Sequence, residues 1–423
     1  MRVLFVTFPW KTHLYLTVPM AWALRTAGHD VHVASSPEFT DVITGTGLTA
    51  VAAGSGPSLQ EKGDLIIQRA ARSGMVLPKV DYAREEQLTW ENLKAFHTVF
   101  AMIMEAANDS MVDDLVAYCR SWKPDLVVWE SMSYAGSVAA AAAGVPHARM
   151  HLAIDVGTPL RQRFLTVRAQ QPPGDREDPV EEWMSKWASK YGFDASEELL
   201  TGQFTIDQMP DSIRSESDVR NVSVRYVPHN GPSVIPNWIH EKPPAPRVLA
   251  TFGVSMWSVA GSQPVPVGQI QEMLDSVADL DIELMLTLSE SIQRKLKRVP
   301  ENTRIVNFVP LHAVISSCSA VMHHGGVPAF CGALAHGVPQ LMVSLTAQDA
   351  QIRGQRLEEA RAGLWIPPQD MTGPRIREDL VRLLEDPSFR SGAERLRQEM
   401  AAQPSPNDVV PELEKLAAEY GSR

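Results

Sequence analysis

The chain has 423 residues, of which 44% are hydrophobic and 21% are charged, as is typical of globular proteins. This length is too great for one ordinary hydrophobic core and predicts two domains of roughly 200 residues each. The net charge of −11 argues against nucleic acid or an anionic membrane as the main partner. No run approaches 18 apolar residues, and the three cysteines show no metal-ligand spacing. We therefore expect a cytoplasmic protein without a membrane span or a disulfide framework.

The first 50 residues alternate between strand and helix patterns. We expect strands at 2–8, 31–34 and 48–52, with helices at 18–27 and 37–46. This order predicts a parallel, doubly wound α/β sheet. The first turn reads Pro9-Trp10-Lys11-Thr12-His13 and lacks the glycine-rich dinucleotide fingerprint, so no nicotinamide or flavin cofactor is expected.

The rest of the chain repeats this alternation after a break. Residues 82–120 fit one or two long helices, and 126–129 fit a strand followed by an alanine-rich helix over 134–143. Prolines between 232 and 246 predict a semi-rigid connector. Beyond it we expect strands at 247–252, 282–287 and 304–308, a helix at 267–278, and a last helix at 411–420.

The segment 321–329 is the most informative one. It closes a buried strand, passes through His323-His324-Gly325-Gly326, and enters a helix of small residues that ends at Gly337. Glycines allow close approach of the backbone to a ligand, and a helix N-terminus offers free N–H groups and positive potential. The pattern is consistent with a phosphate site, although such turns also occur for packing reasons alone.

Five motifs in this order resemble the GT-B glycosyltransferases of family 1, particularly the actinobacterial enzymes that attach deoxysugars to antibiotic aglycones. The motifs are the first helix, the linker entry, the first loop of the C-terminal half and two nucleotide-site segments, at residues 18–29, 225–232, 251–255, 308–312 and 323–326. The resemblance implies two Rossmann-like doubly wound domains facing a central cleft.

The expected domains follow from this resemblance. An acceptor-binding domain would cover 1–228, a proline-rich linker 229–246, and a nucleotide-sugar-binding domain 247–405. A C-terminal helix, 406–423, would pack back on the first domain. The implied activity is metal-independent, inverting transfer of a deoxysugar from a dTDP-sugar to a hydrophobic polyketide or antibiotic aglycone, with no cofactor beyond that co-substrate.

The resemblance also assigns the donor site. His324 would contact the diphosphate, and the loop of Val309 would border the base. The remaining residues implied at the phosphates or the sugar are Thr251, Gly253, Ser255, Gly325, Gly326, Gln348 and Asp349.

His13 matches the position of the general base in the family. Such a base removes the proton of an acceptor hydroxyl, and histidine titrates near neutral pH. A carboxylate would orient the imidazole. Glu130, at the end of the strand 126–129, is the first candidate, and Asp155 is the second. Glu130 would equally serve as an N-terminal cap of the following helix.

Two departures from the family pattern fall at the donor site. Pro328 and Ala329 replace a glycine and a threonine, so an N–H and a hydroxyl are missing. Ala347-Gln348-Asp349 inverts the usual order of acid and amide. A catalytically weak homologue that binds or activates another glycosyltransferase is therefore a second hypothesis. The resemblance also allows a cytochrome-P450-like auxiliary protein, docking near 82–118, and a homodimer.

Overall fold

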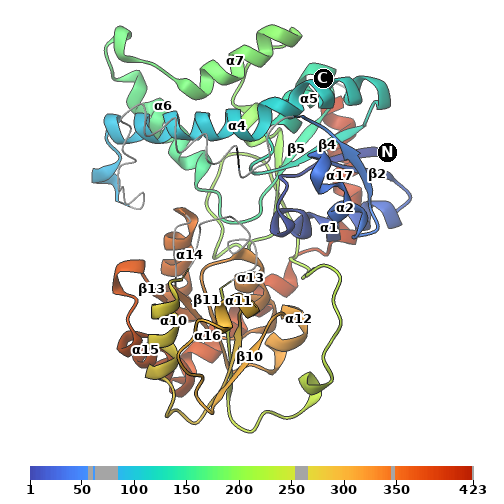
Figure 1. The fold of residues 1–423 in the computed structure, drawn as a ribbon. Helices are drawn as coiled ribbons and strands as arrows, with labels where there is room; N and C mark the ends of the chain where they lie inside the picture. The colour runs from blue at the N-terminus through green and yellow to red at the C-terminus, as the bar shows by residue number, and fades with distance from the viewer. Residues whose placement is uncertain (56–60, 62–83, 253–264, 344–347, 422–423) are drawn as a thin grey trace. The chain divides into compact units, whose positions relative to one another are not determined.

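The computed structural model describes residues 1–55, 61, 84–252, 265–343 and 348–421. The chain forms two compact units (Figure 1). The first contains residues 1–208, 215–224 and 404–423, and the second contains 209–214 and 225–403. Segments 209–214 and 225–228, which the expected boundaries place in the first domain, thus group with the second unit.

The first unit alternates strands and helices from its N-terminus. Its elements are β1 (Arg2–Val6), α1 (Lys11–Thr26), β2 (Asp30–Ser35), η1 (Pro37–Phe39), α2 (Thr40–Thr44), β3 (Thr49–Ala52), η2 (Glu85–Gln87), α4 (Trp90–Trp122), β4 (Leu126–Glu130), α5 (Ala135–Ala143), β5 (His147–Met150), α6 (Gly157–Ala169), η3 (Pro173–Asp175), α7 (Pro179–Tyr191), α8 (Glu198–Thr201), β6 (Phe204–Asp207), β7 (Asn221–Ser223) and α17 (Pro406–Gly421).

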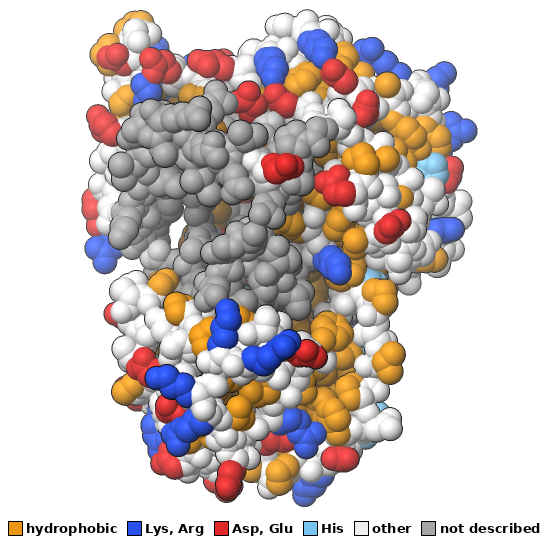
Figure 2. Space-filling view, viewed as in Figure 1, with side chains coloured by type: hydrophobic (Ala, Val, Ile, Leu, Met, Phe, Trp, Pro, Cys, Tyr) orange, Lys and Arg blue, Asp and Glu red, His pale blue; other side chains and the backbone are white. Residues whose placement is uncertain are grey.

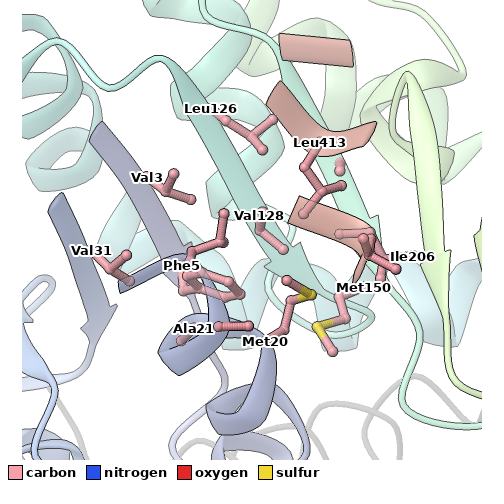
Figure 3. Close-up of a cluster of buried hydrophobic side chains, with 14 of the residues drawn as sticks. Val3, Phe5, Met20, Ala21, Val31, Leu126, Val128, Met150, Ile206 and Leu413 are labelled. Carbon is pink, nitrogen blue, oxygen red and sulfur yellow. The ribbon is translucent and has the colours of Figure 1, made fainter. Parts of the chain in front are cut away.

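The strands of the first unit form one parallel sheet in the order β3-β2-β1-β4-β5-β6-β7. Because alternate side chains of a strand point to opposite faces, Val3 and Phe5 pack with α1 and α17, whereas Leu4 and Val6 pack with α4, α5 and α7. Figure 3 shows Leu413 of α17 among the buried side chains of the first face. Both faces of the sheet are therefore covered.

The second unit repeats this design. Its elements are η4 (Asn237–His240), β8 (Arg247–Thr251), α10 (Val267–Ser276), β9 (Glu283–Thr287), α11 (Glu290–Gln293), β10 (Thr303–Val306), α12 (Leu311–Val314), η5 (Ile315–Ser317), β11 (Ala320–His323), α13 (Val327–His336), β12 (Gln340–Val343), α14 (Gln348–Glu359), β13 (Gly363–Ile366), η6 (Pro368–Asp370), α15 (Gly373–Glu385) and α16 (Pro387–Ala402).

The second sheet is also parallel, in the order β10-β9-β8-β11-β12-β13. Val248 and Ala250 face a core with α10 and α15, and Leu249 faces a core with α12 and α13. In both sheets the strand order reverses beside the first strand, β1 or β8, as in the Rossmann fold. This confirms the predicted pair of Rossmann-like, doubly wound domains.

Two helices start earlier than expected. Helix α1 begins at Lys11 instead of Val18, so His13 lies in its first turn and not in a loop. Helix α17 begins at Pro406, with Pro411 inside it, and packs beside α1. Proline tolerates the first turn of a helix, and a packed apolar face outweighs one missing hydrogen bond further in.

On the face drawn in Figure 2, acidic and basic side chains are interspersed.

Candidate active site

The first group of polar residues lies at the topological switch point of the first sheet, between β1 and β4, where the strand order reverses. β1 pairs with β4, with Val6 opposite Trp129, so the segments that follow these two strands start side by side. One segment leads through Phe8 to His13 in α1, and the other begins at Glu130. The carboxyl ends of strands at such a point form the usual ligand-binding crevice of an open α/β sheet.

The Glu130 carboxylate is fully buried and holds His13. Its Oε2 lies 3.0 Å from Nδ1 of His13, and the side chain of Glu130 has no exposed surface. Three further groups donate hydrogen bonds to this carboxylate: the amides of Phe8 (3.0 Å) and Met132 (3.1 Å) and the hydroxyl of Ser133 (2.6 Å). Since a carboxylate only accepts, the neutral imidazole carries its proton on Nδ1 and presents the Nε2 lone pair.

The surroundings of Glu130 keep it ionised. Burial by itself would raise the pKa of Glu130, but the charge of His13 and the hydrogen bonds from His13, Ser133 and Met132 lower this pKa below its ordinary value. The carboxylate is therefore charged at neutral pH, and it stabilises an imidazolium at His13.

The His13 imidazole is enclosed but not sealed. The rings of Phe8 and Trp10 lie 5.4 and 5.5 Å from it, centroid to centroid, and 17% of the His13 side chain is exposed. Its Nε2 has no hydrogen-bond partner among the described residues. The geometry provides an oriented base with one free nitrogen.

Asp155, the second candidate partner of His13, is engaged elsewhere. Its Oδ2 lies 2.7 Å from Nη2 of Arg149 and 3.1 Å from Nε2 of His151, and its Oδ1 accepts the amide of Thr158. Burial would raise the pKa of Asp155, but the charges of His151 and Arg149 lower it far below its ordinary value. The structure thus brings Glu130 to His13 and leaves Asp155 in a separate buried ion network.

The second group lies at the same topological point of the second sheet. β11 pairs with β8, which places Thr251 opposite His323. Thr251 is buried, and its hydroxyl oxygen accepts the hydroxyl of Thr287 at 2.9 Å. Gly253 and Ser255, expected at the same edge, lie outside the described residues.

His323 holds the turn that follows β11. It is fully buried; its Nδ1 accepts the amide of Gly325 at 3.0 Å, so its Nε2–H donates to Oε1 of Gln340 at 2.8 Å. Burial lowers the pKa of His323 to about 3. This histidine is a neutral structural element that holds the turn through both ring nitrogens.

His324 lies in the turn itself, against glycine. Gly325 has φ +90°, which favours glycine, and a Cβ on Gly326 would lie 2.7 Å from Cε1 of His324. Nδ1 of His324 is buried and has no hydrogen-bond partner among the described residues. Burial lowers the pKa of His324 to about 4, against the opposing effect of a hydrogen bond with the backbone of Thr251 and with a small further lowering by the charge of Arg353. A buried, unpaired nitrogen is costly unless a ligand satisfies it.

Helix α13 begins directly after this turn. Gly326 is its N-cap residue and makes no side-chain cap, and Pro328 and Ala329 occupy the first turn. Pro328 has no N–H, so this helix start offers fewer donors to an anion than an ordinary one. The departure expected from the sequence therefore falls on the helix terminus that a phosphate would meet.

Asp349, in the first turn of α14, faces inward. Its Oδ2 lies 2.6 Å from Nε of Arg353, one helical turn along, and Arg353 is 99% buried. The side chain of Gln348 lies outside the described residues. Asp349, the acid expected near the sugar, is thus the counter-ion of Arg353, which no sequence pattern marks.

The side chain of Val309, whose loop was expected to border the base, is buried, and that of its neighbour Phe308 is exposed. The Val309 side chain is buried in the core beside α12, whereas Phe308 exposes 46% of its surface. An exposed ring is available to stack on a base, and a buried valine borders a ligand through its backbone at most. The two residues are neighbours in the segment after β10, and the sequence offers no signal that decides which side chain turns inward.

The sequence did not mark Ser133, which donates to Glu130, Arg353, which pairs with Asp349, or the exposed ring of Phe308. Ser133 was detectable, because it lies three residues after Glu130 at a helix start. Among the described residues, no group of three potential ligands could hold a metal ion, and no helix there is long and apolar enough to cross a membrane.

Family comparisons agree with both halves of this description. Residues 22–253 match the family described as erythromycin biosynthesis protein CIII-like, N-terminal domain, and residues 271–416 match the C-terminal domain of the same name. The chain is 44% identical to 10-deoxymethynolide desosaminyltransferase of Streptomyces venezuelae, over 99% of this chain and 98% of that protein. It is 40% identical to 3-alpha-mycarosylerythronolide B desosaminyl transferase of Saccharopolyspora erythraea, over 99% of both.

Solved structures extend the similarity to the fold. The glycosyltransferase VinC in complex with dTDP has a TM-score of 0.87 and 35% identity, covering 99% of this chain and 100% of VinC. The spinosyn forosaminyltransferase SpnP has a TM-score of 0.81 and 36% identity, covering 99% of both chains. The chain therefore belongs to the erythromycin biosynthesis protein CIII-like family and is a glycosyltransferase of the GT-B fold.

Proposed function

We propose that this enzyme transfers a deoxysugar from a dTDP-sugar to a hydroxyl of a hydrophobic polyketide aglycone, with inversion at the anomeric carbon. The observation that carries the proposal is the buried Glu130 carboxylate, which fixes His13 with Nε2 free. The names of the two desosaminyltransferases, and the dTDP bound to VinC, support the choice of donor and acceptor.

The reaction is a single displacement in this proposal. As the acceptor oxygen attacks the anomeric carbon, its proton moves to Nε2 of His13, and the bond between that carbon and the diphosphate oxygen breaks. The electron pair of that bond leaves with dTDP. Glu130 accepts the hydrogen bond from Nδ1–H of His13 throughout and stabilises the imidazolium, which is the role of a carboxylate that orients a base.

The donor diphosphate would bind at the turn 323–326 and the start of α13. Nδ1 of His324, which is buried and has no hydrogen-bond partner among the residues that the structure describes, would donate to the diphosphate once the imidazole is protonated, or accept a hydroxyl of the sugar donor while it is neutral. Backbone N–H groups and the positive end of the α13 dipole would favour the anion. The ring of Phe308 would stack on the thymine, with the backbone of Val309 beside it.

The oriented base also distinguishes the enzyme from the hypothesis of a binding or activating partner, which has no need for a buried carboxylate on His13. The proposal also covers four separate properties. Metal independence is tested by chelation with EDTA, and a cytoplasmic location by fractionation. A cytochrome-P450-like accessory protein is tested by adding it to the assay, and association with a second copy of the chain by sedimentation.

The first experiment is a thermal shift with dTDP, UDP, GDP and NAD. A ligand at 100 times its Kd adds about 2.7 kcal/mol to the free energy of unfolding and raises the Tm of such a chain by several degrees. We expect stabilisation by dTDP and little by NAD. Turnover of dTDP-desosamine with 10-deoxymethynolide, used as surrogate substrates, follows. No shift with any nucleotide would overturn the assignment of the donor.

A further inference from the structure

Arg353 is a deeply buried charged group near the donor turn. Its side chain is 1% exposed, and its guanidinium carbon lies 5.0 Å from the centroid of the Phe330 ring in α13. Asp349 is its ion-pair partner, with 2.6 Å between Nε and Oδ2. A buried charge is expensive, so a fold retains one where the charge has a use or a complete set of partners.

The set of partners of Arg353 is incomplete. The Nε and Nη1 atoms of Arg353 and the Oδ2 atom of Asp349 are buried without a hydrogen bond of normal geometry among the described residues. The contact between the two side chains is therefore an ion pair by distance, without the aligned N–H group that would make it a fixed bidentate pair. The guanidinium keeps hydrogen-bonding capacity that the described residues do not use.

The charge of Arg353 acts on the donor turn. It lowers the pKa values of both His323 and His324, after the larger effect of burial. The first turn of α14 also touches this turn, because Ala350 lies 3.6 Å from the position that a Cβ of Gly325 would take. His324 and Arg353 thus share one neighbourhood, and each has a buried nitrogen without a partner.

We propose that Arg353 is a positioning residue that supplies a fixed positive charge beneath the turn 323–326 for the diphosphate of the donor, with Asp349 as its counter-ion. The inference rests on the proposed function and adds to it the source of the charge. It accounts for the inverted order of Gln348 and Asp349, because an acid at position 349 reaches Arg353 at i,i+4. It also offsets the loss of donors at Pro328 and Ala329.

The test compares dTDP affinities of variants that change the charge in opposite directions. We expect Arg353→Gln to weaken dTDP binding, measured by isothermal titration calorimetry, by about tenfold or more, because a unit charge several ångströms away is lost from a site of moderate dielectric constant. Arg353→Lys should retain most of the affinity. Asp349→Asn should tighten binding several-fold, because the guanidinium is then uncompensated.

An arginine–aspartate pair in another helix provides a control of the same contact distance, with an arginine that is 44% exposed. In α15, Arg375 and Asp379 have the same i,i+4 spacing and the same 2.6 Å between Nε and Oδ2. The charge of Arg375 acts with Asp379, Glu378 and Asp370 and not with the histidines of the turn. Arg375→Gln and Asp379→Asn should therefore leave the dTDP affinity unchanged, whatever they do to the Tm.

The outcomes separate the inference from the function beneath it. If wild-type protein binds dTDP and Arg353→Gln binds it equally well, the inference is wrong and the proposed donor stands. If Asp349→Asn weakens binding as much as Arg353→Gln, the pair is merely structural. Should Arg353→Gln fail to fold, the lysine and asparagine variants decide. Wild-type protein that does not bind dTDP would overturn both.

Discussion

The coupling between Glu130 and His13 gives the sharpest test of the proposed mechanism. The perturbation is a double-mutant cycle of Glu130→Gln and His13→Ala. If Glu130 acts through His13, the two changes are non-additive, because the carboxylate has no catalytic task once the imidazole is absent. If Glu130 only caps the following turn, the effects on kcat are independent.

The magnitude follows from the four hydrogen bonds at Glu130. Each carboxylate oxygen accepts two donors, so one end of a glutamine must turn its NH₂ toward donor groups. The tolerable orientation points NH₂ to Phe8 and Ser133, whose hydroxyl can rotate to accept, and keeps oxygen at His13. Neutralising a charged hydrogen-bond partner costs roughly 1.5–3 kcal/mol, so we expect kcat to fall about 10- to 150-fold.

The assay is single-turnover transfer from dTDP-desosamine, with the Tm of each variant measured in parallel. His13→Ala should lower the rate by roughly 10²–10⁴-fold, the usual contribution of a general base, and the double variant should be little slower. Asp155→Asn is the matched control, since it neutralises a buried carboxylate bound to other partners. Its effect should multiply with that of His13→Ala. A Glu130→Gln effect that multiplies in the same way would refute the assignment.

Three further predictions concern the donor site. Phe308→Ala should weaken dTDP binding by roughly 1–3 kcal/mol, the usual value of base stacking, whereas Val309→Ala should chiefly lower the Tm; the reverse pattern, by calorimetry and thermal melts, would contradict the stacking role. Replacing Pro328 and Ala329 by Gly and Thr should tighten dTDP binding if the start of α13 meets the phosphates, and an unchanged Kd would exclude that contact. Because the pKa of His324 is lowered to about 4, the unfolded chain takes up its proton first as pH falls below about 6.5, and stability is lost between these values. His324→Asn should therefore reduce the loss between pH 6.5 and 4.5 by about 2 kcal/mol in urea unfolding, and an equal loss in both proteins would count against a neutral His324.

The order of strands and helices was readable from the sequence because parallel strands buried on both faces produce short, continuous apolar runs. β1, β2, β4, β8 and β11 all fall where those runs predict them. Helix starts were less readable. The residue before α1 is Trp10, which is not an N-cap residue type and makes no side-chain cap, so only packing reveals that α1 begins at Lys11.

The residues of the sites were predictable to the extent that they follow strands. Glu130 and His324 each end or follow a buried strand, and a polar residue there marks the ligand edge of a sheet. Arg353 carries no such mark, because an arginine in a polar helix usually faces solvent and its burial depends on tertiary packing. The opposite burial of Phe308 and Val309 has the same cause, since the packing of the segment after β10, and not composition, decides which side chain turns inward.

The two sheets use one topological position for two different chemical tasks. Beside β1 and β4, a buried acid is ionised so that it stabilises a positive imidazole, and its four donors satisfy it completely. Beside β8 and β11, the imidazoles are held neutral, and within the described part of the chain Nδ1 of His324 and Nη1 of Arg353 have no hydrogen-bond partner. A satisfied network fixes a geometry, whereas a buried N–H group without an acceptor, such as that of Arg353, carries a penalty that an anion can relieve. The contrast therefore argues that the first site is organised before any substrate arrives, and that the second reaches its stable state only when the donor binds.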